Sequence, residues 1–290
     1  MLLTYDIISK GFVVIAAATC PLLLFVNAPF GRFTLPNDHA LTIFNVDGIK
    51  SWIFMELFSP ITFTYAFTQA PLLDHVSRVS APQGLLAGLF LAHYLNRALV
   101  SPLRTPSRSR SHLSVVLAGM CFNIFNGLMM GTYLRSDIAH AFLSVAFRRP
   151  SYWGGILIWL AGFTGNILHD EILLNIRRNA KAKGKAKYED DPAKKRAEHY
   201  AIPHGYLYKY ISYPNYFCEW VEWIAFAFAA APLPPLSSPA AFMENIHGPW
   251  VFVLSEILLM LPRAYKGHQW YLDKFAEYPK ERKAVVPFII

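Results

Sequence analysis

The sequence predicts an all-α integral membrane protein with several transmembrane helices. Two observations lead to this fold class. Hydrophobic residues make up 54% of the 290 positions, whereas only 16% are charged. A typical soluble domain carries about 25% charged residues, so the deficit indicates a surface that faces lipid. The apolar residues also gather into long stretches, and a helix that crosses a bilayer needs about 20 mostly apolar residues.

Seven stretches meet this requirement, so we expect seven transmembrane helices. They lie at 9–27, 51–72, 82–101, 113–133, 151–170, 216–235 and 247–263. The first stretch has the alternative of a cleaved signal peptide. Asp6 and a single lysine, Lys10, precede it, whereas a signal peptide begins with a clearly basic region. We therefore interpret this stretch as a membrane span.

Basic residues predict the orientation of these spans. Between the third and fourth spans lie Arg104, Arg108 and Arg110, and the segment 171–215 and the C-terminal tail are rich in lysine and arginine. Cytoplasmic loops carry such an excess, so we expect the N-terminus to be lumenal and the C-terminus cytosolic. The net charge of +8 lies mainly in these loops. That distribution favours a lipid bilayer as partner and gives no indication of nucleic acid binding.

Polar side chains inside the spans predict a cavity. An ionisable residue there costs roughly 2.5–3.5 kcal/mol, so each one requires a reason. Hydrogen bonding between helices is the structural alternative. Most of the set lies toward the predicted cytosolic ends of the third, fifth, sixth and seventh spans, with Glu56 nearer the middle of the second. The set comprises Glu56, His93, Tyr94, Arg97, Asn123, Asn126, Asn166, His169, Asp170, Glu219, Glu222, Arg263 and His268.

Helical spacing indicates a dinucleotide site of an unusual kind. Asn166 and Asp170 share one helix face, as do Asn215, Glu219 and Glu222. Amide and carboxylate groups accept hydrogen bonds from ribose hydroxyls, and arginines bind phosphates. No GxGxxG or GxxxxGK[ST] motif is present, which argues against a soluble nucleotide-binding fold.

Two further patterns favour simpler interpretations. Gly127 and Gly131 form a GxxxG motif, which is typical of close helix packing. His199 and His204 are one histidine pair, whereas a membrane di-iron centre needs several pairs, so we expect no metal.

The region from Asn166 to Ile290 resembles the C-terminal part of the steroid 5-alpha-reductase family (3-oxo-5-alpha-steroid 4-dehydrogenases). The resemblance rests on five runs, and the N-terminal part adds weaker matches in FMELFSP, HYLNR and NGLMMGTYL. The five runs are NILHDEILLNIR, YAIPHGYLYKYIS, PNYFCEWVEW, RAYKGHQWYLDKF and EYPKERKAVVPFI.

This resemblance implies a seven-helix, NADPH-dependent enzyme of the endoplasmic reticulum membrane. It would form one integrated domain, with residues 1–150 on the substrate side and residues 151–290 on the NADPH side. Glu56 and Tyr94 would meet the 3-keto oxygen of a steroid. The residues that would line the cofactor are Asn166, Asp170, Arg177, Tyr200, Asn215, Glu219, Arg263, His268, Tyr271 and Arg104.

The expected reaction is reduction of the 4,5 double bond of a 3-oxo-4-ene steroid. Hydride would reach C5, Tyr94 would donate a hydrogen bond to the 3-keto oxygen, and Glu56 would orient Tyr94 or donate as a protonated acid. The α carbon would take a proton from water. Other reductases on the same scaffold, acting on a trans-2-enoyl-CoA or on a polyprenol, are the alternatives. PNYF in place of ANFF favours the enoyl-CoA group.

Two more distant alternatives fit less well. An isoprenylcysteine-type methyltransferase has paired glutamates after its late arginine, whereas Arg263 is followed by AYKGHQWY. A receptor or transporter is disfavoured by the gathering of polar residues toward one side.

Overall fold

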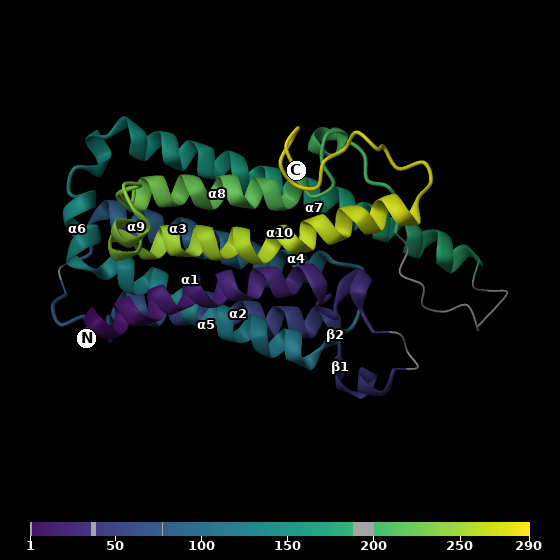
Figure 1. Ribbon diagram of the computed structural model, residues 1–290, viewed down its shortest axis with the longest axis horizontal. Helices are drawn as coiled ribbons and strands as arrows, with labels where there is room; N and C mark the ends of the chain where they lie inside the picture. The colour runs from purple at the N-terminus through teal and green to yellow at the C-terminus, as the bar shows by residue number, and fades with distance from the viewer. Residues whose placement is uncertain (1, 36–38, 77, 188–199) are drawn as a thin grey trace.

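Long helices running side by side make up the protein, as the computed structural model in Figure 1 shows. The structure describes residues 2–35, 39–76, 78–187 and 200–290. The principal helices lie at the seven expected places. They are α1 (Leu2–Phe25), α2 (Gly48–Gln69), α3 (Ala81–Leu95), α5 (Leu113–Arg135), α7 (Pro150–Lys187), α8 (Pro214–Ala230) and α10 (Gly248–Lys274).

Shorter elements complete the ends of the bundle. At the N-terminal end of α1 lie α6 (Asp137–Leu143) and α9 (Pro239–Asn245) (Figure 1). At the opposite end, β1 (Asn45–Val46) and β2 (Ser111–His112) pair antiparallel, which ties the segment before α2 to the segment before α5.

The third helix does not stop at Leu95. It continues through a π-helical turn, η3 (Asn96–Val100), into α4 (Ser101–Arg104). A π turn inserted in an α-helix is rare and is often associated with a functional site. Here it contains Arg97, the residue that organises the polar network described below.

Local sequence explains where the helices begin. The Asp47 carboxylate accepts hydrogen bonds from the backbone N–H groups of Ile49 and Lys50, which caps α2. Ser80 and Gln83 form a capping box at the start of α3. Proline occupies the first turn of α8 and α10, where no backbone donor is lost.

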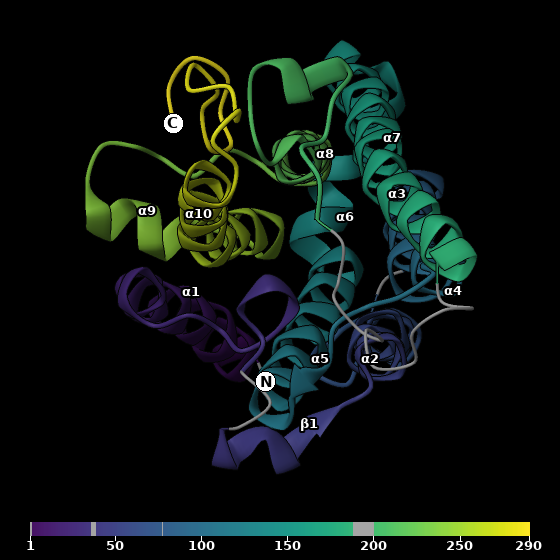
Figure 2. The same cartoon turned by 90° about the vertical axis from the view of Figure 1, so that its right-hand side faces the viewer.

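Glycines allow two helix pairs to approach closely. An added Cβ at Gly127 would strike Ser59 and Thr62 of α2, which confirms the packing interpretation of the GxxxG motif. On α7, a Cβ at Gly162 would lie 2.7 Å from both the carbonyl oxygen of Cys218 and the backbone nitrogen of Glu222. The pairs α2–α5 and α7–α8 therefore pack backbone to backbone, and α1 packs along α10 (Figure 2).

Among the described residues, three helices are long and apolar enough to cross a membrane by length and composition alone. They cover Tyr5–Phe25, Leu113–Arg135 and Pro150–Ala182, and the bent pair α9–α10, with an angle of 119°, gives a fourth candidate. The other helices in expected places, α2, α3 and α8, are shorter or more polar. They contribute Glu56, His93 and Glu219, which lower their hydropathy while facing the protein interior.

Several expected boundaries were wrong: α1 begins at Leu2 and not at residue 9, and α10 continues past residue 263 to Lys274. The fifth span was expected to end at residue 170, but α7 continues to Lys187. The charged residues after Asp170 lie beyond the apolar part of α7, so the helix can continue there in contact with water. The lysine-rich segment that follows Asn179 is thus helical as far as Lys187, and residues 188–199 lie outside the described part of the chain.

Candidate active site

A polar cavity lies where the ends of several helices meet, at the end of the bundle that carries β1 and β2. Its volume is about 330 Å³. Seven of the ten residues expected to contact a cofactor line it. They are Asn166, Asp170, Arg177, Asn215, Glu219, Arg263 and Tyr271.

The amide and carboxylate residues form a connected row along α7 and α8. Asn166 Nδ2 donates to Glu219 Oε2 over 3.2 Å and to the backbone oxygen of Asn215 over 3.1 Å. Asn215 Nδ2 in turn donates to Asp170 Oδ1 over 3.0 Å. The close approach of α7 and α8 makes these contacts possible. The remaining carboxylate and amide oxygens present acceptors to the cavity, as ribose hydroxyls and a carboxamide require.

Besides Arg97, four arginines line the same cavity: Arg32, Arg108, Arg177 and Arg263. Within the described residues, none of the four has a carboxylate partner. Burial and the like charge of Arg177 lower the pKa of Arg108 to about 9. A cluster of unneutralised guanidinium groups at a cavity wall is suited to bind phosphate.

Aromatic rings hold these arginines in place. The Arg32 guanidinium lies 4.7 Å from the ring centroid of Trp270 and 4.5 Å from that of Tyr271. Arg108 stacks on Trp52 at 3.6 Å, and Arg263 stacks on Phe30 at 3.5 Å. Such cation–π contacts orient a guanidinium without neutralising its charge. Arg32 and Phe30 come from the segment after α1, so the N-terminal part of the chain helps to form the cavity.

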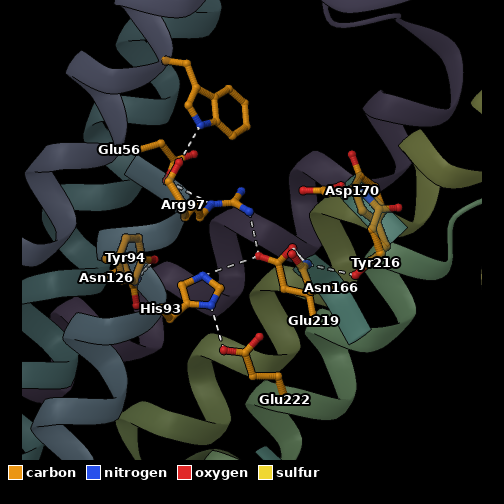
Figure 3. A network of polar contacts seen from close by, with 12 residues as sticks. Glu56, His93, Tyr94, Arg97, Asn126, Asn166, Asp170, Tyr216, Glu219 and Glu222 are labelled. Carbon is orange, nitrogen blue, oxygen red and sulfur yellow. Dashed lines mark hydrogen bonds and ion pairs between the residues drawn. The ribbon is translucent and has the colours of Figure 1, made fainter. Parts of the chain in front are cut away.

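Arg97 connects the two halves of the chain (Figure 3). Its Nε donates to Glu56 Oε2 over 3.0 Å, and its Nη1 donates to Glu219 Oε1 over 2.8 Å. Both carboxylates are buried. The structure thus gives Glu56 a guanidinium as its partner. That Glu56 orients Tyr94 or donates as a protonated acid stays a prediction.

Tyr94 faces a different space. Its hydroxyl accepts a hydrogen bond from Asn126 Nδ2 over 2.6 Å, and Asn126 Nδ2 also contacts Ser59 Oγ at 3.1 Å. Tyr94 also borders an apolar groove of about 680 Å³ between α2 and α3, together with Leu57, Leu91 and other aliphatic residues. Its neighbour His93 lines the polar cavity. His93 and Tyr94, which are consecutive in α3, thus border the polar cavity and the apolar groove respectively.

Three expected cofactor residues lie beside the cavity instead of lining it. The Tyr200 ring packs against Trp270, with centroids 4.9 Å apart. His268 Nδ1 is 2.6 Å from Ser212 Oγ, and Ser212 lines the cavity. Arg104 is near the surface, where its Nη2 is 2.7 Å from Glu171 Oε2.

Several residues were not identified as site residues from the sequence. Arg97 was noted as a polar residue within a span, and only its position three residues after Tyr94 pointed to the site. Arg32 and Arg108 lie in connecting segments, where arginine is ordinary, so no sequence pattern distinguished them. Of the histidine pair considered for a metal, His199 lies outside the described residues and His204 Nδ1 is 3.4 Å from Arg282 Nη2.

Comparison with known proteins identifies the family. A family model described as 3-oxo-5-alpha-steroid 4-dehydrogenase matches residues 109–290, more than half of the chain. The chain belongs to this family. As a member of the 3-oxo-5-alpha-steroid 4-dehydrogenases, it is an oxidoreductase that acts on a CH–CH group.

Relatives of this oxidoreductase extend along most of its length. It is 30% identical to 3-oxo-5-alpha-steroid 4-dehydrogenase 1 of Rattus norvegicus over 270 residues, which cover 91% of this chain and 87% of the relative. It is 28% identical to Steroid 5-alpha-reductase DET2 of Gossypium hirsutum over 95% of this chain and 93% of the relative. It is 40% identical to Uncharacterized protein C9.08c of Schizosaccharomyces pombe over 93% of this chain and 94% of the relative.

Proposed function

We propose that this protein reduces the 4,5 double bond of a 3-oxo-4-ene steroid with NADPH as the reductant. The printed names of the rat and cotton relatives support a steroid substrate. The observation that carries the proposal is the placement of Tyr94 at an apolar groove, next to a cavity bordered by five arginines. An apolar enone fits the groove, and a phosphate-bearing nucleotide fits the cavity.

The residues of the cavity fit NADPH. The unpaired guanidinium groups of Arg108, Arg177 and Arg263 would hold its phosphates. The row formed by Asn166, Asp170, Asn215 and Glu219 would hold the ribose hydroxyls and the carboxamide. NADPH, when bound, supplies the hydride.

The protein's own contribution is to orient the substrate and to polarise its carbonyl group. Because the Tyr94 oxygen accepts from Asn126, its proton is left to donate to the 3-keto oxygen. Negative charge develops on that oxygen during reduction, so the hydrogen bond stabilises the transition state more than the ground state. Glu56 would act on the site indirectly, because it binds Arg97, which also binds Glu219 of α8.

Seven membrane crossings, an endoplasmic reticulum location, a lumenal N-terminus and a cytosolic C-terminus belong to the same proposal. The helices alternate in direction, and the cavity lies at the end expected to face the cytosol, where NADPH is available (Figure 1). The groove, between two helices of a membrane bundle, would take an apolar substrate from the bilayer.

A substrate panel tests the proposal. The purified protein in detergent or lipid nanodiscs is given NADPH and, separately, a 3-oxo-4-ene steroid, a trans-2-enoyl-CoA and a polyprenol. We expect NADPH oxidation with the steroid and a product heavier by two hydrogens in mass spectrometry. Oxidation with enoyl-CoA or polyprenol alone would replace the steroid by that substrate class.

A further inference from the structure

A buried pair of titratable residues beside the cavity has no part in the chemistry described so far. His93 Nδ1 lies 2.7 Å from Glu222 Oε1. The Glu222 side chain is fully buried, and its other oxygen, Oε2, has no hydrogen-bond partner in the described residues. His93 lines the cavity and Glu222 lies behind it (Figure 3).

The charges around this pair require it to hold a proton. Arg97 donates to Glu56 and Glu219, so its hydrogen bonds to carboxylates do not include Glu222. Glu256 of α10, also buried, adds a further carboxyl group that interacts with Glu219 and Glu222. An unpaired buried carboxylate costs several kcal/mol, so a neutral His93–Glu222 pair, with one transferable proton between them, is favoured.

The proposed reaction needs such a proton. Hydride addition at C5 forms a C–H bond, and the electron pair of the 4,5 double bond moves to give an enolate. The enolate must then form a bond between C4 and a proton. Tyr94 would stabilise the oxygen, and the ring of His93, whose centroid lies 5.1 Å from that of Tyr94, lines the cavity.

We propose that the His93–Glu222 pair supplies the proton that completes the reduction at C4. This inference rests on the proposed function. The Nε2–H bond of His93 breaks, the enolate electron pair forms the C4–H bond, and the proton shared with Glu222 passes to Nδ1, so that the imidazole stays neutral and Glu222 becomes a carboxylate. A proton from solvent that enters the cavity then restores the pair. Glu222 acts as a positioning residue through His93. The route refines the expectation that water protonates the substrate directly, because water here refills the pair.

The Nε2 side of His93 faces Glu219, which lines the cavity. Nε2 is 3.8 Å from Glu219 Oε1, a distance at which the group is near the cavity wall without a direct hydrogen bond. The charged groups that face His93 are Glu222 and Glu219 of α8, Arg97 of η3, Glu56 of α2 and Glu256 of α10.

The test separates hydride transfer from proton transfer. His93→Gln and Glu222→Gln preserve size and polarity but remove the proton supply. In single turnovers with a 3-oxo-4-ene steroid, NADPH oxidation is followed by absorbance and the saturated steroid by mass spectrometry. We expect oxidation to stay close to wild type, while formation of the saturated product slows about 100-fold and gains a larger solvent deuterium isotope effect.

Controls distinguish this result from loss of structure. Tyr152→Phe removes a buried hydroxyl that donates to Pro82 O near the start of α7, and should leave both rates unchanged. NADPH affinity should be equal in all variants. If His93→Gln and Glu222→Gln form the saturated product at the wild-type rate and with the wild-type isotope effect, the pair is not the proton donor, and the proposed reductase function is unaffected. A wild-type protein that oxidises no NADPH with any such steroid overturns the proposed function, and the delivery step with it.

Discussion

Arg97 and Glu219 lie 122 positions apart in the sequence, and their side chains meet over 2.8 Å. The same guanidinium contacts Glu56, so one side chain joins α2, η3 and α8. Both carboxylates are buried, whereas Arg97 is 30% exposed toward the cavity. The three residues therefore form a wall between the polar cavity and the apolar interior.

Arg97→Met should destabilise the protein strongly. It leaves two buried carboxylates without their partner, which costs about 3–5 kcal/mol. Thermal unfolding in detergent measures the loss. Arg104→Met is the matched control, because its ion pair with Glu171 is largely exposed and such pairs contribute below about 1 kcal/mol. Equal losses in the two variants would contradict the importance assigned to Arg97.

Tyr94→Phe should slow catalysis while leaving cofactor binding intact. Loss of a hydrogen-bond donor to a developing oxyanion reduces kcat by about 100-fold to 1000-fold. Steady-state kinetics with a 3-oxo-4-ene steroid provide the measurement. Tyr152→Phe makes the same chemical change near the start of α7, and its kcat should equal that of wild type. A fully active Tyr94→Phe would remove this hydroxyl from the mechanism.

Asp170→Ala should weaken NADPH binding. It removes the acceptor for Asn215 Nδ2 and an oxygen that faces the cavity. Hydrogen bonds to charged groups contribute about 1.5–3 kcal/mol, so affinity should fall about 10-fold to 100-fold. Quenching of tryptophan fluorescence reports the affinity. Asp273→Ala, on the exposed part of α10, serves as control. Unchanged binding in Asp170→Ala excludes this carboxylate from the cofactor site.

Arg108→Gln should weaken NADPH binding and yet stabilise the protein without nucleotide. Burial and neighbouring arginines lower the pKa of Arg108 to about 9 in the folded state. The charged form therefore opposes folding at neutral pH, and wild-type stability should rise as pH increases through about 9. Arg108→Gln should lack this rise. Melting curves between neutral pH and pH 10, with and without NADPH, test both statements. A variant that melts lower without nucleotide would argue for a structural role.

Gly162→Ala should destabilise the bundle. Its added Cβ meets the backbone of Cys218 and Glu222, and such overpacking costs about 1–3 kcal/mol. Gly154→Ala on the same helix is the control, since an added Cβ there meets nothing within 4 Å. Alanine favours helix over glycine by about 0.8–1.0 kcal/mol, so this control should be slightly more stable than wild type. Thermal unfolding of both variants provides the comparison.

The sequence predicted the helices better than it predicted their contacts. Apolar stretches located every long helix because that signal is local and needs only about 20 residues. Helical spacing also placed Asn166 with Asp170, and Asn215 with Glu219. The partner of Glu56 was missed because Arg97 approaches it only after α2 and η3 pack. Arg32 was missed for the same reason, since its cavity position depends on contacts with Trp270 and Tyr271 from the other end of the chain.

The bridge through Arg97 also has a meaning for biogenesis. Helices of a membrane protein enter the bilayer in order of synthesis, so Glu56 and Arg97 are in place before Glu219 is translated. Until α8 arrives, Arg97 has only one of its two carboxylates. If the protein were split between α6 and α7 and expressed as two fragments, the Arg97–Glu219 ion pair would favour their association. The C-terminal fragment would carry Glu219 without its guanidinium partner, and the N-terminal fragment would carry Arg97 with one of its two carboxylates, so each fragment would lack a contact that only the other supplies.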